Sequence, residues 1–211
     1  MRAVSNGGQP DTRAFWRALR SRHPPLTVAL VQDARVTALH RGERHEFSSR
    51  ADAALQIARL AWRSDAFLAQ ALYRVKASLQ ARGVPVLPRL AHRLAMVLAQ
   101  ISIGDPVIMA PGVYIVHGQV VADGLVEIGE GAVIAPFVTI GLRAGNVQGA
   151  RIGPRVHIGT GAKVIGPVTI GEGAQIGANA VVLDDVAPGV TVVGAPARPV
   201  AERRPAPNTA P

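Results

Sequence analysis

The sequence contains no cysteine. Disulfide bonds, thiolate metal sites and a cysteine nucleophile are therefore excluded, and we expect a cytoplasmic location. No run of about 18 apolar residues is present, and the N-terminal MRAVSNGGQP has no apolar segment after a basic one. We therefore expect neither a membrane span nor a secretory signal. Aromatic residues make up only 4% of the chain, which fits a core of small aliphatic side chains.

Lysine is also scarce, with 2 residues against 21 arginines. Residues 1–100 hold 16 of the 23 basic and 6 of the 14 acidic residues, a net charge of +10, and the remainder carries −1. Such an excess is typical of binding to nucleic acid or anionic membranes, or of a solvated arginine-rich helical surface. No nucleic-acid motif or set of stacking aromatics accompanies the charge, so we expect the solvated surface and no nucleic-acid partner.

The first hundred residues show helical periodicity. A short amphipathic helix is predicted over 12–22, ended by Pro24 and Pro25. The segment 26–47 fits either a β-hairpin or a helix followed by a turn. One or two helices are predicted after Ser48 and Ser49 as far as Gly83, with Ser64 and Asp65 as the cap of the second, and another helix over 89–100.

From Ile103 the pattern changes to a period of six residues. The units read IGDPVI, MAPGVY, IVHGQV, VADGLVE with one extra residue, IGEGAV, IAPFVT and IGLR. After an eight-residue insertion, AGNVQGAR, they resume as IGPRVH, IGTGAK, VIGPVT, IGEGAQ, IGANAV and VLDDVA. Each unit offers one aliphatic residue to a narrow interior, and a small residue relieves crowding at a turn. So regular a period predicts a parallel β-helix.

These repeats resemble the hexapeptide-repeat acyltransferases. ALYRVKASLQARGVPVLP before ISIGDPVIMAPGVYIVH, with a closing VVLDDVAPGVTVVGAPARPV, is similar to the serine O-acetyltransferase branch over roughly residues 65–200. The resemblance implies an α+β chain with a small helical domain at 1–100 and a left-handed parallel β-helix of about five coils at 101–200. We expect 201–211 to be a disordered tail, like the first ten residues. It also implies a homotrimer or a dimer of trimers, with active sites between subunits, and a role in cysteine biosynthesis.

The resemblance places His117 at the general base. A neutral imidazole suits removal of a proton from a hydroxyl that attacks a thioester, although His117 also fits a residue that packs a turn.

The sequence departs from the family pattern at three places that concern the acceptor site. Val116 stands where the family commonly has Asp, the following segment is one residue short, and the loop ending in Gln148, Gly149, Ala150 and Arg151 lacks the family's Arg-His pair.

Two residues are candidates for acceptor binding. Arg151 can clamp a carboxylate through its guanidinium fork, or it is a solvated loop residue. Asp65 is the nearest analogue of a family carboxylate near the substrate amine, or it is only a helix cap.

Acetyl-CoA is the co-substrate that the resemblance implies. The family's small-residue edge for the pantetheine arm matches Gly159, Ala162, Lys163, Gly177 and Ala178, and Arg198 can meet phosphates, as can Arg203 and Arg204. The same small residues also suit the turns of the prism itself.

No metal is expected, because a zinc site needs three imidazoles and the repeats hold only His117 and His157.

The sequence therefore predicts an acetyl-CoA-dependent O-acetyltransferase acting on a small hydroxylated molecule. Two alternatives stay open: an O-acetyltransferase for a sugar or secondary metabolite, and a non-catalytic assembly or regulatory protein. The altered acceptor loop favours the alternatives, and the retained His117 and GAPAR segment favour an enzyme.

Overall fold

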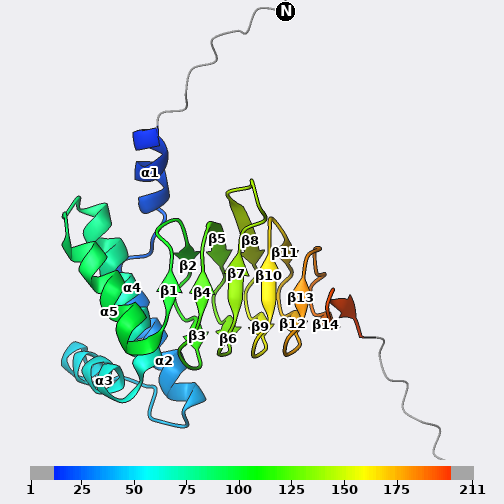
Figure 1. Ribbon diagram of the computed structural model, residues 1–211. Helices are drawn as coiled ribbons and strands as arrows, with labels where there is room; N and C mark the ends of the chain where they lie inside the picture. The colour runs from blue at the N-terminus through cyan, green and yellow to red at the C-terminus, as the bar shows by residue number, and fades with distance from the viewer. Residues whose placement is uncertain (1–11, 201–211) are drawn as a thin grey trace, which may run out of the picture.

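The computed structural model describes residues 12–200, which form five helices followed by a stack of short strands (Figure 1). The predictions for the first ten residues and for 201–211 lie outside the described residues. The helices are α1 (Thr12–Arg20), α2 (Leu26–His40), α3 (Arg50–Arg63), α4 (Asp65–Ala81) and α5 (Leu87–Ala99). None of the helices in this range is long and apolar enough to cross a membrane.

Local sequence signals explain where the helices begin. The Ser49 hydroxyl accepts a hydrogen bond from the Asp52 amide at the start of α3, and Ser64 accepts one from Phe67 at the start of α4. Ser64 therefore separates two helices within the predicted helical region. The ambiguous segment 26–47 contains α2 and a turn rather than a hairpin.

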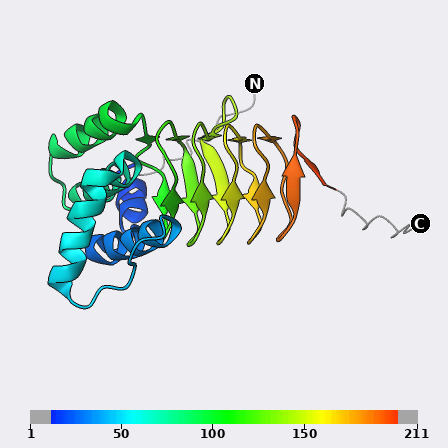
Figure 2. The ribbon, with the colours of Figure 1, turned by 90° about the horizontal axis from the view of Figure 1, so that it is seen from below.

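Fifteen strands of the described region form three sheets, which are parallel apart from one short antiparallel pair at the C-terminal end of sheet C. Sheet A has the order β1-β4-β7-β10-β13, sheet B β11-β8-β5-β2 and sheet C β15-β14-β12-β9-β6-β3. The chain visits A, B and C in turn, so successive coils stack along one axis (Figure 2). The strands are β1 (Ser102–Ile103), β2 (Ile108–Met109), β3 (Tyr114–Ile115), β4 (Val121–Ala122), β5 (Leu125–Ile128), β6 (Val133–Ile134), β7 (Thr139–Gly141), β8 (Gln148–Ile152), β9 (His157–Ile158), β10 (Lys163–Ile165), β11 (Thr169–Ile170), β12 (Gln175–Ile176), β13 (Val181–Val182), β14 (Thr191–Val193) and β15 (Arg198–Pro199).

The period of six places one aliphatic residue of each strand inside the prism. Val121 pairs with Thr139 and Lys163 with Val181, so each coil uses three repeats. The buried positions include Ile103, Met109, Ile115, Ile128, Ile134, Ile140, Ile152, Ile158, Ile170 and Ile176. The predicted fold class, a helical domain followed by a β-helix of about five coils, is confirmed.

The extra residue of the repeats lies elsewhere than predicted. Ser102 pairs with Val121, so their separation in the sequence is one residue longer than three repeats of six. Val121 pairs with Thr139, and this separation equals three repeats. Val121 is 42% exposed and Ala122 only 1%. The placement of the extra residue in 121–127 was therefore wrong: it lies in the turn 116–120, and Ala122 rather than Val121 enters the core.

The predicted insertion loop is shorter than the sequence indicated. Gln148 to Arg151 belong to β8, which pairs with β5, and Ala150 is fully buried. Only 142–147 lies between β7 and β8. An added segment that pairs with a neighbouring coil gains the backbone hydrogen bonds that an exposed loop lacks.

A row of polar side chains on α4 covers the first coil. Amides of this coil donate to the second coil, for example Ser102 to Val120 and Tyr114 to Ala132, so several of its carbonyls face away from the stack. Side chains of α4 donate to them: Gln70 to Val113 (2.9 Å), Tyr73 to Val107 (2.7 Å), Arg74 to Met109 (2.5 Å) and Ala110 (2.7 Å), and Lys76 to Ile103 (2.6 Å). The helical domain thus closes the end of the β-helix.

Candidate functional site

His117 lies in the turn between β3 and β4, and its side chain is exposed. The turn is held against the end of α5. The Gln119 amide donates to the Ala99 carbonyl at 3.0 Å, and a Cβ on Gly118 would lie 2.1 Å from the same oxygen. Gln119 has a φ of 66°. The last residue of α5 therefore fixes the backbone that carries His117.

The turns that lead from sheet C to sheet A stack below His117. We call this row, residues 116–120, 135–138, 159–162 and 177–180, the C–A edge. Its turns are hydrogen bonded to one another: Gly161 donates to Pro136 at 2.9 Å and Asn179 to Thr160 at 2.8 Å. The structure thus brings His117 onto the same edge as Gly159, Ala162, Gly177 and Ala178.

The small residues of this edge have different surroundings. A Cβ on Gly159 would lie 2.8 Å from the Ala178 amide nitrogen, and one on Gly177 would lie 2.7 Å from a methyl group of Val193. Ala162 is fully buried in the prism, whereas Ala178 is exposed. The backbone of the next coil thus requires glycine at 159, whereas at 177 the obstacle is the side chain of Val193, which is 45% exposed. An exposed residue such as Ala178 is better placed to touch a ligand.

Of the cationic residues predicted to bind acetyl-CoA, Lys163 and Arg198 are described and already have partners, whereas Arg203 and Arg204 lie outside the described residues. The Lys163 ammonium donates to the carbonyls of Phe137 at 2.8 Å and Gly161 at 3.0 Å, and so ties two turns of the C–A edge together. Arg198, in β15, is exposed and lies 3.2 Å from a carboxylate oxygen of Asp184.

The predicted acceptor-binding residues lie elsewhere in the chain. Arg151 is exposed on sheet B, in register with Glu127, which forms a 2.8 Å ion pair with Arg22. Sheet B is the side of the prism opposite the C–A edge, so Arg151 and His117 do not meet within one chain. Asp65 is the exposed first residue of α4, where a carboxylate favours the positive end of the helix dipole.

Two more histidines lie on or against sheet C near this site, of which the sequence had indicated only His157. The rings of His40 and Tyr114 stack with centroids 4.3 Å apart. Tyr114 precedes His117 by three residues in the sequence. The exposed His157 lies on the same sheet, in register between Val133 and Gln175. His40 belongs to α2, and no sequence pattern links it to a strand so distant in the chain. Within residues 12–200, no group of three or more His, Asp or Glu side chains is arranged to hold a metal ion.

Comparison with known proteins agrees with this architecture. The family model for the bacterial transferase hexapeptide (six repeats) matches residues 149–184. None of the curated proteins matches the chain by sequence. Serine acetyltransferase from Neisseria gonorrhoeae in complex with serine superimposes with a TM-score of 0.71 at 21% identity, over 92% of this chain and 85% of that one.

Two further structures extend the likeness. The soybean serine acetyltransferase apoenzyme has a TM-score of 0.69 at 26% identity, over 92% of this chain and 85% of that one. A serine acetyltransferase in complex with CoA has a TM-score of 0.68 at 24% identity, over 87% and 73%. The chain has the serine acetyltransferase fold. The resemblance inferred from the sequence is confirmed, and the comparisons support the predicted acyltransferase.

Proposed function

We propose that this protein is an acetyl-CoA-dependent O-acetyltransferase in which His117 is the general base. The observation that carries the proposal is an exposed imidazole held by backbone contacts at the C–A edge, next to turns built from small residues. The likeness to serine acetyltransferases, one of them a CoA complex, supports the same chemistry.

The reaction needs only one proton acceptor. As the acceptor hydroxyl attacks the thioester carbonyl, His117 takes its proton, and a new carbon–oxygen bond forms. Collapse of the intermediate breaks the carbon–sulfur bond, and the leaving CoA thiolate takes the proton from the imidazolium. Transfer is direct, which fits a chain without cysteine.

Acetyl-CoA would lie along the C–A edge. Exposed small residues such as Ala178 leave room for the pantetheine arm, and Arg198 at the far end of the prism would exchange its Asp184 partner for a phosphate. Gly159 and Gly177 would contribute through backbone amides and by keeping the edge narrow.

The acceptor site would be completed between subunits. Because Arg151 and His117 lie on opposite sides of one prism, a carboxylate clamp by Arg151 requires a neighbouring chain, in a homotrimer or a dimer of trimers. L-Serine is the acceptor that the neighbours' serine complexes favour. With serine as acceptor, a cytoplasmic role in cysteine biosynthesis follows.

A different hydroxylated acceptor, such as a sugar or secondary metabolite, is the second candidate. Two observations favour it: Val116 replaces a carboxylate beside His117, and the register places Glu127 beside Arg151. A carboxylate next to the guanidinium competes with the carboxylate of an amino acid. A non-catalytic assembly or regulatory protein is the third candidate.

The test is CoA thiol release from acetyl-CoA, with L-serine and with a panel of hydroxylated acceptors. We expect acceptor-dependent release that falls by about 10²–10⁴-fold in His117→Ala. His45→Ala, at an exposed histidine of the helical domain, is the matched control and should keep full activity. Release of the CoA thiol with a different acceptor only would keep His117 as the base but would replace serine as the acceptor. No release with any acceptor, despite CoA binding, would favour the non-catalytic candidate.

A further inference from the structure

Phe137 is an unusual residue for its place in the β-helix. It lies in the turn between β6 and β7 and has a φ of 62°. The register of sheet A aligns four residues at one position of the C–A edge, all with a positive φ: Gln119, Phe137, Gly161 and Asn179. Glycine and asparagine adopt this conformation readily, whereas a bulky side chain is strained in it. A phenylalanine at this position therefore needs an explanation.

Packing within one chain does not supply that explanation. Gln119 is held by the hydrogen bond from its amide to Ala99. Arg155, which has a φ of 53° in a turn from sheet B to sheet C, forms an ion pair with Glu172. Phe137 is 53% exposed, and no aromatic ring or cation of residues 12–200 stacks on its ring. Its side chain is thus neither buried nor tied to a neighbour in this way.

The turn of Phe137 follows the turn of His117 along the prism axis. The Val121 amide donates to the Val138 carbonyl at 3.0 Å, which joins the two turns. Parallel strands lie about 4.8 Å apart, a distance that an aromatic side chain spans. Phe137 therefore stands one coil beyond His117 in the direction of the exposed Ala178, on the path proposed above for acetyl-CoA.

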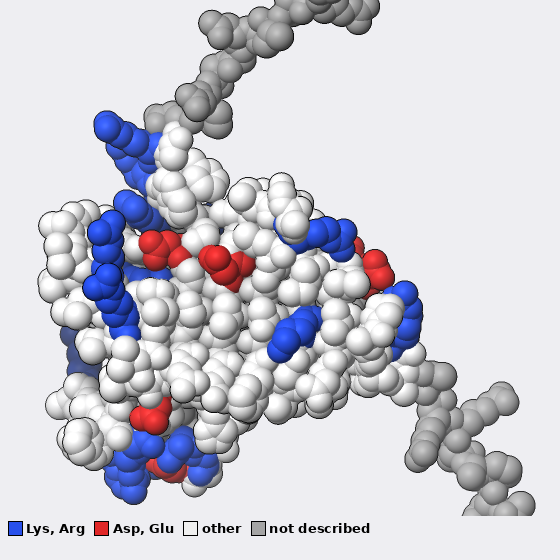
Figure 3. Space-filling model, in the orientation of Figure 1, with Lys and Arg blue, Asp and Glu red and all other residues white. Residues whose placement is uncertain are grey.

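The chemistry of acyl-CoA suits this placement. The end that meets the base is a thioester on a short aliphatic chain, to which an aromatic ring offers apolar contact and a favourable contact with sulfur. The phosphates at the other end of CoA need cations. In Figure 3, white side chains cover most of the area around β4 and β7, and blue ones lie over the helices and at the far end of the prism. The surface near His117 thus suits the thioester better than the phosphates.

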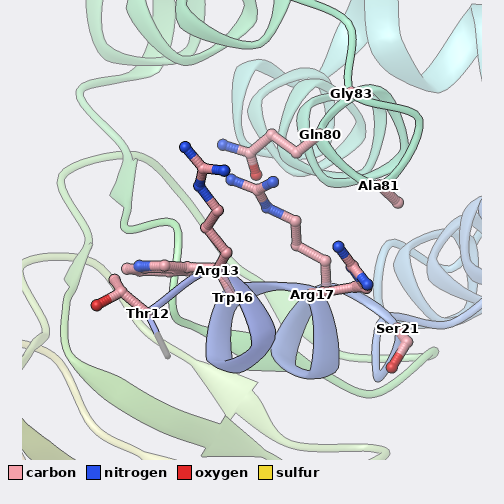
Figure 4. Close-up of a pocket in the computed structure, with 9 residues that line it drawn as sticks. Thr12, Arg13, Trp16, Arg17, Ser21, Gln80, Ala81 and Gly83 are labelled. Atoms are coloured by element: carbon pink, nitrogen blue, oxygen red, sulfur yellow. The ribbon is translucent and has the colours of Figure 1, made fainter. Parts of the chain in front are cut away.

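The hollow between α1 and the end of α4 is not an alternative place for the thioester. Figure 4 shows Arg13 and Arg17 rising from α1 toward Gln80 in this hollow of about 570 Å³. Its described lining residues lie within 12–21 and 80–83, so none belongs to the C–A edge. This hollow therefore does not place a ligand on His117.

A contact between subunits also fits the ring less well. Such contacts are expected to form a contiguous apolar patch. Phe137 is the only large apolar side chain that is exposed on the C–A edge. A single ring among small and polar neighbours suits a bound molecule.

We propose that Phe137 binds the acyl donor, with its ring packed against the thioester end of acyl-CoA beside His117. The inference rests on the proposed function, which places acyl-CoA along the C–A edge. Contact with the ligand accounts for a ring at a position where the prism itself favours glycine or asparagine.

The test is calorimetric titration of the full chain with acetyl-CoA in about 0.15 M salt, where distant charges are screened. Phe137→Asn and Phe137→Gly should each weaken binding by about tenfold or more, since both remove the apolar contact of the ring. Their urea unfolding midpoints should stay the same or rise, because both residues suit a positive φ. Unchanged affinity, or a lower midpoint in both variants, would overturn the proposal.

Arg155→Gly is the matched control, because it places glycine at a positive φ on a different edge. It should leave the affinity for acetyl-CoA unchanged, and an equal loss there would contradict a local contact by Phe137. Light scattering tests the subunit contact: a smaller mass for the Phe137 variants would assign the ring to assembly instead.

His117→Ala separates this inference from the proposed function. It should lose thiol release but bind acetyl-CoA like the parent. If binding depends on Phe137 and release does not depend on His117, the proposed function fails and the ring contact stands. If release depends on His117 and the Phe137 variants bind normally, only the ring contact fails. No binding by the parent would remove both.

Discussion

At the scale of single residues, two reasons could require glycine on the C–A edge: close packing of the next coil and room for a ligand. Gly159 follows an inward-pointing isoleucine, and the backbone of the next coil approaches it so closely that a Cβ would lie 2.8 Å from both the Ala178 nitrogen and the Ile176 oxygen. A ligand along the edge would also need a small residue there. The position of the backbone shows that stability alone is sufficient to require glycine.

Gly159→Ala is therefore expected to lower the free energy of unfolding by about 1–3 kcal/mol, because the backbone of the next coil must move. Urea unfolding measures this change. Ala178→Ser, at an exposed position of the same edge, is the control and should change stability little. An unchanged unfolding midpoint together with lost CoA binding would assign Gly159 to the ligand instead.

His23 carries a second prediction at this scale. Burial, and then the charges of Arg74, Lys76 and Arg22, lower the pKa of His23 to about 4, and its buried Nδ1 has no partner among the described residues. The unfolded chain binds a proton near pH 6.5, before the folded protein does. Stability is therefore complete above that pH and falls as the pH drops from about 6.5 toward 4.

We expect His23→Gln to flatten this dependence in urea unfolding between pH 4 and 7. The difference in slope should stay below about 1.4 kcal/mol per pH unit, because the ring is only partly buried and solvent screens it. Identical slopes in the two proteins would show that His23 does not carry the effect.

At the scale of elements, α4 joins the helical domain to the β-helix. Arg74 lies at its centre, with 3% of its side chain exposed, and donates to Asp33 of α2 (2.8 and 3.1 Å) as well as to two carbonyls of the first coil. Asp33 also accepts the Gly112 amide at 2.8 Å. Burial raises the pKa of the Asp33 carboxyl, and these hydrogen bonds oppose the shift by favouring the charged form.

Arg74→Met should cost about 3–5 kcal/mol in urea unfolding, because Asp33 would remain buried without its counter-charge. The double variant with Asp33→Leu should recover part of the loss but not all, since the Met109 and Ala110 carbonyls still lack donors. Arg82→Met, at the exposed end of the same helix, should stay within about 0.5 kcal/mol of the parent. A loss below about 1 kcal/mol for Arg74→Met would contradict this role.

At the scale of the whole molecule, one chain presents surfaces that suit assembly. α5 buries Ala91, Ala95 and Ala99 against its neighbours, while Leu90, Leu94 and Val97 on its other side are exposed. Contiguous apolar surface of this kind favours association. The separation of His117 and Arg151 on opposite sides of the prism also favours assembly, because a second chain could bring the two residues together.

Light scattering should therefore give a mass of about three or six times the 22.0 kDa of the chain. If the acceptor site is completed by a second chain, as proposed, specific activity should fall on dilution once the assembly dissociates. A monomer with undiminished activity would place the whole site on one prism and exclude Arg151 from it.

Much of this architecture follows from local sequence. Helix caps such as Ser49 and Ser64, and a period of six that needs one aliphatic residue per unit, act over a few residues and are visible in the order of the chain. They determined the helical domain, the β-helix and its approximate number of coils. His117 was proposed as the base from the resemblance of its local sequence to the family, which was possible because its neighbours in sequence are also its neighbours in the turn.

Other features depend on contacts between distant segments, and only the tertiary structure decided them. The extra residue lies at 116–120 because that turn meets Ala99, and 148–151 form a strand because β5 offers hydrogen bonds there. Arg151 faces Glu127 rather than His117 because register, not sequence order, sets neighbours on a sheet.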